Sequence, residues 1–130
     1  MKTHKELIVW QKSIELVKSV YLHTQSFPNE ELYGLTSQMR RCVVSIPSNI
    51  AEGCGRRSDK ELIQFLYIAL GSASELETQL IISKELSFTN NNSFEDLSSL
   101  NNEVIKLLSA LLKVLKKSAN NSKQPVTCNL

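Results

Sequence analysis

The side chains best suited to binding chemistry are the arginines, which occur only as Arg40, Arg41, Arg56 and Arg57. The planar guanidinium of arginine matches a phosphate group better than the point charge of a lysine does. Glu52 lies four residues before Arg56, the favourable order for a helical ion pair, and this pairing would leave the other three arginines free to contact phosphate. The simpler interpretation is a solvated helix face. The functional interpretation is a contact with nucleic acid or an acidic protein.

Residues able to catalyse a reaction are scarce. His4 lies close to the N-terminus and His23 stands alone, and the sequence has neither a Glu-x-x-His pair nor a glycine motif that cradles phosphate. Cys54 is the one candidate nucleophile, because a cation as near as Arg56 favours the thiolate, but no base accompanies it. We therefore expect a protein that is not an enzyme, with no metal, no cofactor and no small-molecule substrate.

Length and composition point to a single cytoplasmic domain. The chain has 130 residues, and its 15 basic against 13 acidic residues are too nearly balanced for net charge to predict a polyanionic partner. The three cysteines form no Cys-x-x-Cys pair and leave one unpaired in any disulfide scheme, which is typical of a reducing compartment. The N-terminal residues are polar, and no segment approaches about 18 uninterrupted apolar residues. We expect neither a signal peptide nor a membrane span.

The elements that would position these side chains are four helices. Apolar residues recur every three or four positions over 6–27, over 30 to the glycines Gly53 and Gly55, over 58–86 and over 93–115. Ser58-Asp59-Lys60-Glu61 reads as a capping box at the start of the third helix. Short connections between four helices predict an all-α, antiparallel up-down-up-down four-helix bundle over residues 1–117. Residues 118–130 are polar and lack periodicity, which predicts a flexible C-terminal tail.

Pro47 interrupts the apolar repeat of the second helix. A proline inside a helix removes one backbone donor and costs about 3 kcal/mol unless its neighbours absorb the change. Ser45 and Ser48 flank it and could hydrogen-bond the carbonyls it frees. One interpretation is a structural kink that lets the helix wrap around its neighbours. The other is a bend that presents Asn49 and the following Gly-Cys-Gly turn to a partner.

The third helix carries more apolar surface than a small bundle can cover. Residues 62–70 are apolar almost all the way round, and such a helix must be covered on every side. The glycine that follows costs about 1 kcal/mol in the middle of a helix, so it indicates a close approach by another helix. We expect a homo-oligomer with an interface at Ile63, Leu66, Leu70 and Gly71. Burial of the same residues within one monomer is the alternative.

Several linked motifs resemble those of a known family. They are Val9-Trp10-Gln11-Lys12, the segment 27–35, Ser45-Ile-Pro-Ser-Asn-Ile-Ala-Glu-Gly53 and Phe65-Leu-Tyr-Ile-Ala-x-Gly71-Ser72-Ala73-x-Glu75-Leu76-Glu77. Together they are similar to the S23 family, the four-helix-bundle proteins encoded in intervening sequences of bacterial 23S ribosomal RNA genes. The resemblance covers about residues 7–115.

The resemblance implies a cytoplasmic bacterial four-helix bundle that assembles as a pentamer. A related protein, the accessory variability determinant of diversity-generating retroelements, binds nucleic acid and a reverse transcriptase through a basic surface. For most members the biochemical role is undefined. Arg40, Arg41, Arg56 and Arg57 match basic positions of the family pattern.

Taken together, the residues and the resemblance lead to one hypothesis and one alternative. The hypothesis is a non-catalytic homo-oligomeric scaffold that binds structured RNA or a nucleoprotein through an arginine-bearing surface, and a nucleic-acid-processing protein is a further possible partner. The alternative is a protein-interaction adaptor that does not bind nucleic acid. In a ring, a modest arginine patch would be repeated in every protomer, so that weak contacts add up.

Overall fold

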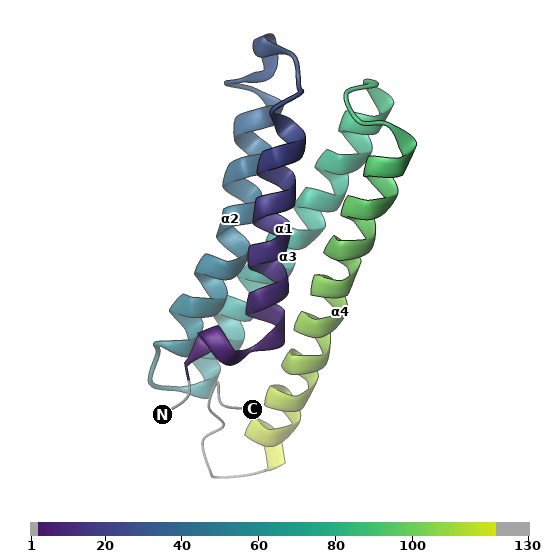
Figure 1. The fold of residues 1–130 in the computed structure, drawn as a ribbon. Helices are drawn as coiled ribbons and strands as arrows, with labels where there is room; N and C mark the ends of the chain where they lie inside the picture. The colour runs from purple at the N-terminus through teal and green to yellow at the C-terminus, as the bar shows by residue number, and fades with distance from the viewer. Residues whose placement is uncertain (1–2, 122–130) are drawn as a thin grey trace.

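The structure is a computed structural model that describes residues 3–121, and Figure 1 shows the arrangement of its elements. Every regular element in this range is helical, which confirms the predicted all-α class. Two are short 3₁₀ turns and four are α-helices: η1 His4–Glu6, α1 Ile8–Thr24, η2 Asn29–Glu31, α2 Leu35–Cys54, α3 Asp59–Glu85 and α4 Asn91–Asn121.

The four α-helices form the predicted up-down-up-down bundle (Figure 1). Each helix packs against two others, in the cycle α1–α2–α3–α4–α1. The α1–α2 connection and the α3–α4 turn lie together at one end, called here the upper end, and the start of α1, the α2–α3 loop and the end of α4 lie at the lower end. None of the helices in residues 3–121 combines the length and apolar character needed to cross a membrane.

The core is a column of aliphatic side chains contributed by all four α-helices. A Leu, Ile or Val side chain that is moved from water into such a core stabilises the fold by about 1.5–3 kcal/mol. The largest side chains that are fully buried are Leu16, Val20, Met39, Val43, Ile46, Ile50, Leu66, Leu76, Leu80, Val104, Leu108 and Leu115.

The expectation that Leu66 faces a second chain is wrong. Its side chain is 0% exposed in the monomer, because the other helices of the bundle already cover that side of α3. Ile63 and Leu70 are half-buried against the core. Gly71 is exposed, and apart from its chain neighbours and the adjoining backbone of α3, no atom of the described residues lies within 4 Å of the Cβ that another residue would carry there. Within residues 62–70 the surplus apolar surface lies instead on Tyr67 and Ile68, which are 45% and 51% exposed.

The start of α3 follows the predicted capping box. Ser58 is the N-cap, and the backbone N–H of Glu61 donates a hydrogen bond to its hydroxyl at 3.2 Å, while the hydroxyl donates to the Glu61 carboxylate at 3.2 Å. At its other end α3 passes into Ser87, whose φ of 63° is in the left-handed region. The backbone N–H of Phe88 then donates back to the carbonyl of Ser83 at 2.8 Å, which closes the helix end and turns the chain toward α4.

Several predicted boundaries are shifted. The first helix starts later than residue 6, because 4–6 form the 3₁₀ turn η1 and Leu7 is extended. The second starts at Leu35 instead of near residue 30, because residues 29–31 form η2. The fourth helix extends through residues 118–121, since a helix already formed can propagate through polar residues at little cost. The rest of the predicted tail, 122–130, lies outside the described residues.

Pro47 lies inside α2, and the segment that follows it packs against the rest of the bundle. The Asn49 side-chain amide donates to the carbonyl of Ser45 at 2.7 Å, within the same helix. A Cβ added to Gly53 would come within 2.9 Å of the Cβ of Phe65, so this glycine permits close packing of α2 on α3, and Gly55 caps the helix. These contacts favour the structural interpretation of the proline.

Candidate functional site

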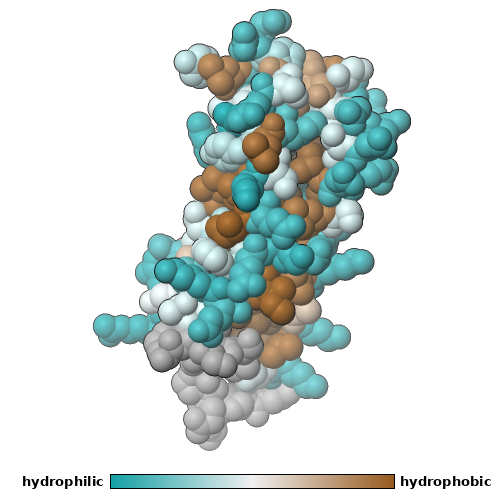
Figure 2. Space-filling model, in the orientation of Figure 1, coloured by the Kyte–Doolittle hydropathy of each residue, from teal (hydrophilic) through white to brown (hydrophobic). Residues whose placement is uncertain are grey.

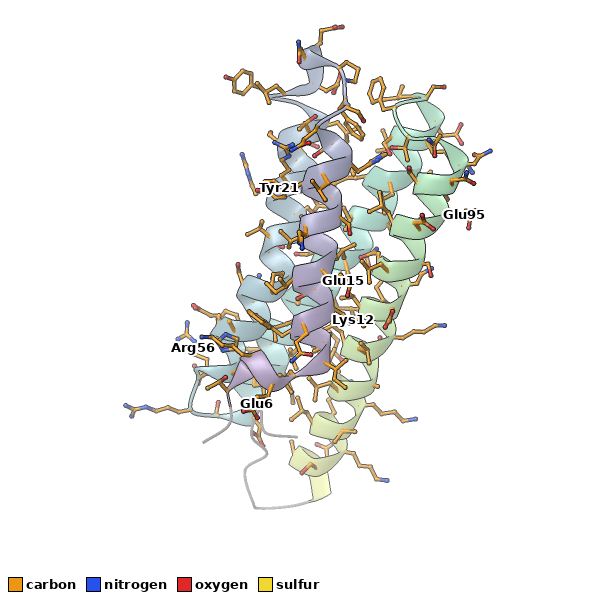
Figure 3. All side chains as sticks on the ribbon, viewed as in Figure 1. Glu6, Lys12, Glu15, Tyr21, Arg56 and Glu95 are labelled. Atoms are coloured by element: carbon orange, nitrogen blue, oxygen red, sulfur yellow. The ribbon has the colours of Figure 1, made fainter. Side chains whose placement is uncertain are left out.

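The four arginines are divided between two places on the molecule. Arg40 stacks on Tyr21 near the upper end, whereas Arg56 lies near the lower end, as the labels in Figure 3 show. Sixteen residues of nearly continuous helix separate the two arginines, which corresponds to about 24 Å along the axis. The four side chains therefore do not form one patch, and the two pairs must be considered separately.

Arg40 is held in place by the end of α1. Its Nε donates to the hydroxyl of Thr24 at 2.9 Å, and its Nη2 donates to the backbone carbonyl of Tyr21 at 3.3 Å. Its guanidinium carbon also lies 4.8 Å from the centre of the Tyr21 ring. None of these groups is a carboxylate, so the positive charge of Arg40 is oriented without being neutralised.

Arg40 and Arg41 line a pocket of about 420 Å³ at the upper end, between the last turn of α1, the η2 turn and the first turns of α2. No acidic side chain is among the residues that line it. We call it the arginine–tyrosine pocket, and its lining residues are Tyr21, Leu32, Tyr33, Thr36, Ser37, Arg40 and Arg41. Arg41 is exposed and takes part in none of the three ion pairs found within residues 3–121.

Two tyrosine rings give this pocket an aromatic surface. Tyr33 is 92% exposed and Tyr21 is 40% exposed. Glu31, the acidic residue nearest to Tyr33 in sequence, uses its carboxylate to accept the backbone N–H of Leu35 at 3.2 Å, at the start of α2. A guanidinium beside an aromatic face can bind a phosphate and stack a planar ring at the same time.

The sequence does not single out either tyrosine as a site residue. Tyr21 falls in the apolar repeat of the first helix, which assigns it to the core-facing stripe. Tyr33 lies in the connection that precedes α2, where periodicity gives no information. The one available signal is an aromatic residue next to a glycine in a polar connection, Tyr33-Gly34 after Asn29–Glu31.

The lower pair of arginines has a different setting. The Nη2 of Arg56 and the Oε1 of Glu52 are 3.0 Å apart, which is the predicted ion pair, and the guanidinium lies 4.9 Å from the centre of the Phe65 ring. Arg57 is exposed in the α2–α3 loop and takes part in none of the ion pairs within residues 3–121. Of this pair, Arg57 is the better placed to meet a phosphate.

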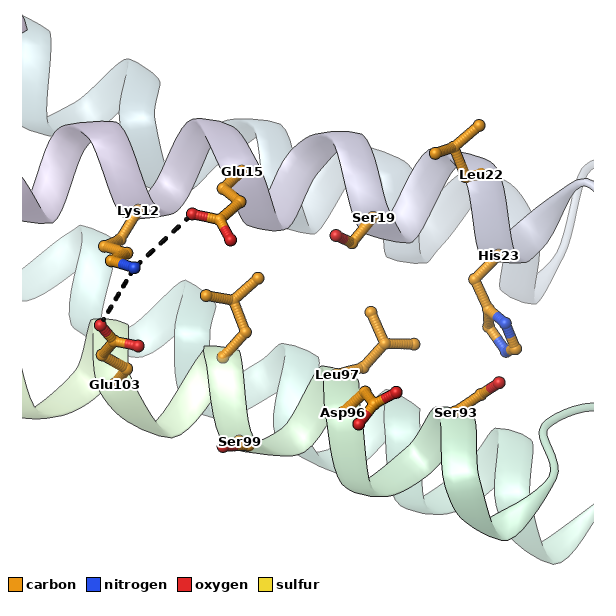
Figure 4. Close-up of a pocket in the computed structure, with 11 residues that line it drawn as sticks. Lys12, Glu15, Ser19, Leu22, His23, Ser93, Asp96, Leu97, Ser99 and Glu103 are labelled. Carbon is orange, nitrogen blue, oxygen red and sulfur yellow. Dashed lines mark ion pairs between the residues drawn. The ribbon is translucent and has the colours of Figure 1, made fainter.

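A groove of about 670 Å³ lies between α1 and α4 (Figure 4). Lys12 spans it, with its Nζ 3.7 Å from the carboxylate of Glu15 and 3.4 Å from that of Glu103. Asp96 adds a third carboxylate. Because acidic side chains outnumber basic ones here, this groove is unsuited to a phosphate-bearing ligand.

His23 lies at the upper end of this groove and closes a chain of hydrogen bonds between helix ends. The hydroxyl of Ser83 donates to the carbonyl of Leu80 at 2.8 Å and shares a 2.8 Å hydrogen bond with the hydroxyl of Thr89. Because Ser83 has a single proton, Thr89 donates to Ser83 and accepts from Nε2 of His23, 2.8 Å away. Burial lowers the pKa of His23 from its ordinary value of 6.5, so the neutral imidazole is favoured.

This lowered pKa predicts a pH dependence of stability. The unfolded chain protonates His23 at a higher pH than the folded chain, so the free energy of unfolding is greatest above the unfolded value of 6.5 and falls as the pH drops toward the folded value. We expect urea midpoints to fall between about pH 7.5 and about pH 5.5, with a smaller fall in His23→Gln. An equal fall in both proteins would show that other groups cause it.

The buried thiol of Cys42 is poorly suited to chemistry. Burial, together with the nearby carboxylate of Glu75, raises the pKa of Cys42 to about 12, and the thiol donates to the backbone carbonyl of Ser72 at 3.0 Å. Cys54 is half-buried beside the core. Within residues 3–121, no three His, Cys, Asp or Glu side chains are grouped so that they could hold a metal ion.

Comparison with known proteins identifies a family and similar solved structures. A family model described as 23S rRNA-intervening sequence protein matches residues 5–110. A crystal structure of a protein of unknown function from the S23 ribosomal protein family, from Bacteroides thetaiotaomicron VPI-5482, is similar with a TM-score of 0.74 and 28% sequence identity. The similarity covers 82% of this chain and 96% of that one. No curated protein matches the sequence.

Proposed function

Because the chain belongs to the family of 23S rRNA-intervening sequence proteins, we propose that it is a non-catalytic, oligomeric scaffold that binds structured RNA through the arginine–tyrosine pocket. The observation that carries this proposal is the composition of the pocket. Two guanidinium groups without carboxylate partners lie beside two exposed aromatic rings, and no acidic side chain lines the space between them.

The pocket favours nucleotides that are not base-paired. A protein reads structured RNA chiefly at loops and bulges, where bases can leave the helix and stack on aromatic side chains. Tyr33 offers such a surface, and Arg41 can meet the phosphate of the same nucleotide. Arg40 is already held by Thr24 and Tyr21, so binding would cost little side-chain entropy at that position. We therefore assign the pocket to an unpaired nucleotide within a folded RNA.

Oligomerisation remains part of the proposal. The exposed apolar side chain of Ile68, with the bare backbone at Gly71, gives α3 an outer surface, beside the groove that contains Tyr67, on which a second chain can pack. The face drawn in Figure 2 carries separate apolar patches among hydrophilic side chains. We propose a pentamer, as the sequence resemblance implied, and a cytoplasmic location. Five copies of one pocket would turn a modest single contact into tight binding.

The arginine–tyrosine pocket is tested by removing the aromatic ring of Tyr33. Replacing Tyr33 with alanine is expected to weaken binding to an RNA hairpin with an unpaired loop by about 1–3 kcal/mol, the usual loss when one stacked base is deprived of its aromatic partner. Binding is measured by fluorescence anisotropy of a labelled hairpin. Because Tyr33 is 92% exposed, the change should leave the fold intact.

Tyr33→Phe is the matched control, because it keeps the ring and removes only the hydroxyl. It should bind the hairpin like the unmodified protein, and a blunt duplex of the same length should show no difference among the three proteins. If Tyr33→Ala binds the hairpin with the same affinity as the unmodified protein, the arginine–tyrosine pocket is not the RNA-binding site. If the unmodified protein binds neither RNA, the adaptor that binds only proteins becomes the better explanation.

A further inference from the structure

A second groove lies between α3 and α4, in the lower half of the bundle. It measures about 260 Å³ and is lined by Tyr67, Leu70, Ser109, Leu112, Lys113 and Lys116. We call it the lysine groove. It shares no residue with the arginine–tyrosine pocket. Neither lysine takes part in the ion pairs found within residues 3–121.

The aromatic ring and one ammonium group of the lysine groove are held together. Lys116 donates from Nζ to the hydroxyl of Tyr67 at 2.8 Å, and the same nitrogen lies 5.5 Å from the centre of the ring. Tyr67 is 45% exposed, so part of the ring remains open to a ligand. An ammonium group has three donors, of which this bond uses one. The groove therefore presents an aromatic surface and donors for an anion side by side.

The charges around the lysine groove favour an anion. None of the described residues that line it is acidic, and the sequence has no aspartate or glutamate after Glu103. The groove therefore differs from the one between α1 and α4, where carboxylates surround a single lysine. The α2–α3 loop, which contains Arg57, and the first turn of α3, which contains Lys60, lie at the same lower end as the final turns of α4 (Figure 1).

We propose that the lysine groove binds a nucleotide, with the base against Tyr67 and the phosphate at Lys113 and Lys116. For a nucleotide within RNA the inference rests on the proposed function, whereas a free mononucleotide has the same chemistry and needs no RNA. A second copy of the chain fits the groove less well. An apolar helix seated there would bury two ammonium groups without carboxylate partners, and burying an unpaired charge is costly.

The test follows leucine methyl groups by NMR, because each site contains its own reporter. Leu70 and Leu112 line the lysine groove and Leu32 lines the arginine–tyrosine pocket. The probes are adenosine 5′-monophosphate and a ten-nucleotide single-stranded RNA. We expect saturable shifts of the Leu70 and Leu112 methyl groups. Shifts with both probes would identify a site for free nucleotides, and shifts with RNA alone would identify a site that needs the strand.

Two variants and a charge-matched control address the groove directly. Lys113→Gln combined with Lys116→Gln is expected to lower the affinity measured from the Leu70 and Leu112 methyl shifts about tenfold or more. Tyr67→Leu is expected to lower the same affinity about tenfold. The control is Lys106→Gln combined with Lys117→Gln, which removes the same charge from exposed positions outside the groove and should change the affinity less than about threefold.

Four results would overturn the inference, and they separate it from the proposed function. Methyl shifts at Leu32 without shifts at Leu70 or Leu112 would contradict binding in the lysine groove and leave the arginine–tyrosine pocket as the binding site. The absence of methyl shifts at all three leucines would contradict nucleotide binding at both sites. If the double lysine variant and its control lower the affinity equally, binding depends on the net charge of the protein and not on the lysine groove. A Tyr67→Leu protein that changes its oligomeric state would show that a second chain covers this surface.

Discussion

Leu66→Ala is expected to lower the free energy of unfolding by about 2–5 kcal/mol, the range found when a fully buried leucine is truncated in a packed core. Leu66 is 0% exposed and faces the inside of the bundle from α3. The loss combines the transfer energy of the removed methyl groups with the cavity that the neighbouring side chains cannot fill. Urea unfolding followed by circular dichroism at several protein concentrations measures it.

Ile68→Ala is the matched control on the same helix. Ile68 is 51% exposed, so its truncation should change the free energy of unfolding of a single chain by no more than about 0.5 kcal/mol. If the outer surface of α3 joins two chains, Ile68→Ala should instead shift the oligomeric state seen by sedimentation. The reverse result, with Leu66→Ala dissociating an oligomer and leaving the unfolding energy unchanged, would contradict the placement of Leu66 in the core.

Arg40→Gln combined with Arg41→Gln is expected to weaken hairpin RNA binding by about tenfold or more, because a hydrogen bond from a guanidinium to a phosphate is worth roughly 1.5–3 kcal/mol. The slope of log affinity against log salt should also fall by about 1 for each phosphate that the variant no longer neutralises. Arg41→Gln alone is informative, because the side chain of Arg41 forms no hydrogen bond within residues 3–121, whereas Arg40 supports the end of α1.

Arg57→Gln is the control for this pair. It removes the same charge from an exposed arginine at the opposite end of α2, outside the arginine–tyrosine pocket. We expect a smaller loss of affinity than with Arg41→Gln, because no aromatic ring of the pocket lies beside Arg57. Equal losses would mean that RNA senses only the net charge of the protein. Circular dichroism of the double variant checks that the loss does not arise from unfolding of α1.

Local features of the fold could be read from the sequence because they depend on neighbours along the chain. The capping box at Ser58 fixed the start of α3, and the 3.6-residue repeat located all four helices and most of their core-facing residues. The ion pair of Glu52 with Arg56 also needed only helical spacing. Helix ends were less accurate where a short 3₁₀ turn, such as Asn29–Glu31, stands in place of the expected first turn of α2.

The candidate site could not be predicted in the same way, because residue spacing along one helix does not give the distances between side chains on different elements. On a helix that is apolar on every side, the sequence cannot say whether Leu66 or Ile68 faces the core, because the neighbouring helices decide it. Arg41 and Arg56 share a helical repeat in the sequence, yet they lie at opposite ends of α2. Tyr33 and Arg41 line one pocket together with Tyr21 of α1, a grouping that periodicity within α2 does not give.

The most direct test of RNA binding is the affinity of the unmodified protein for a labelled RNA hairpin at about 50 mM and about 200 mM salt, read by fluorescence anisotropy. A protein that neutralises 6–10 phosphates loses roughly 10³ to 10⁵ in affinity over this range, and we expect a fall of this kind for an oligomer that presents several pockets to one RNA. Absence of binding at the lower salt concentration would contradict the proposed function and leave the protein-binding adaptor in its place.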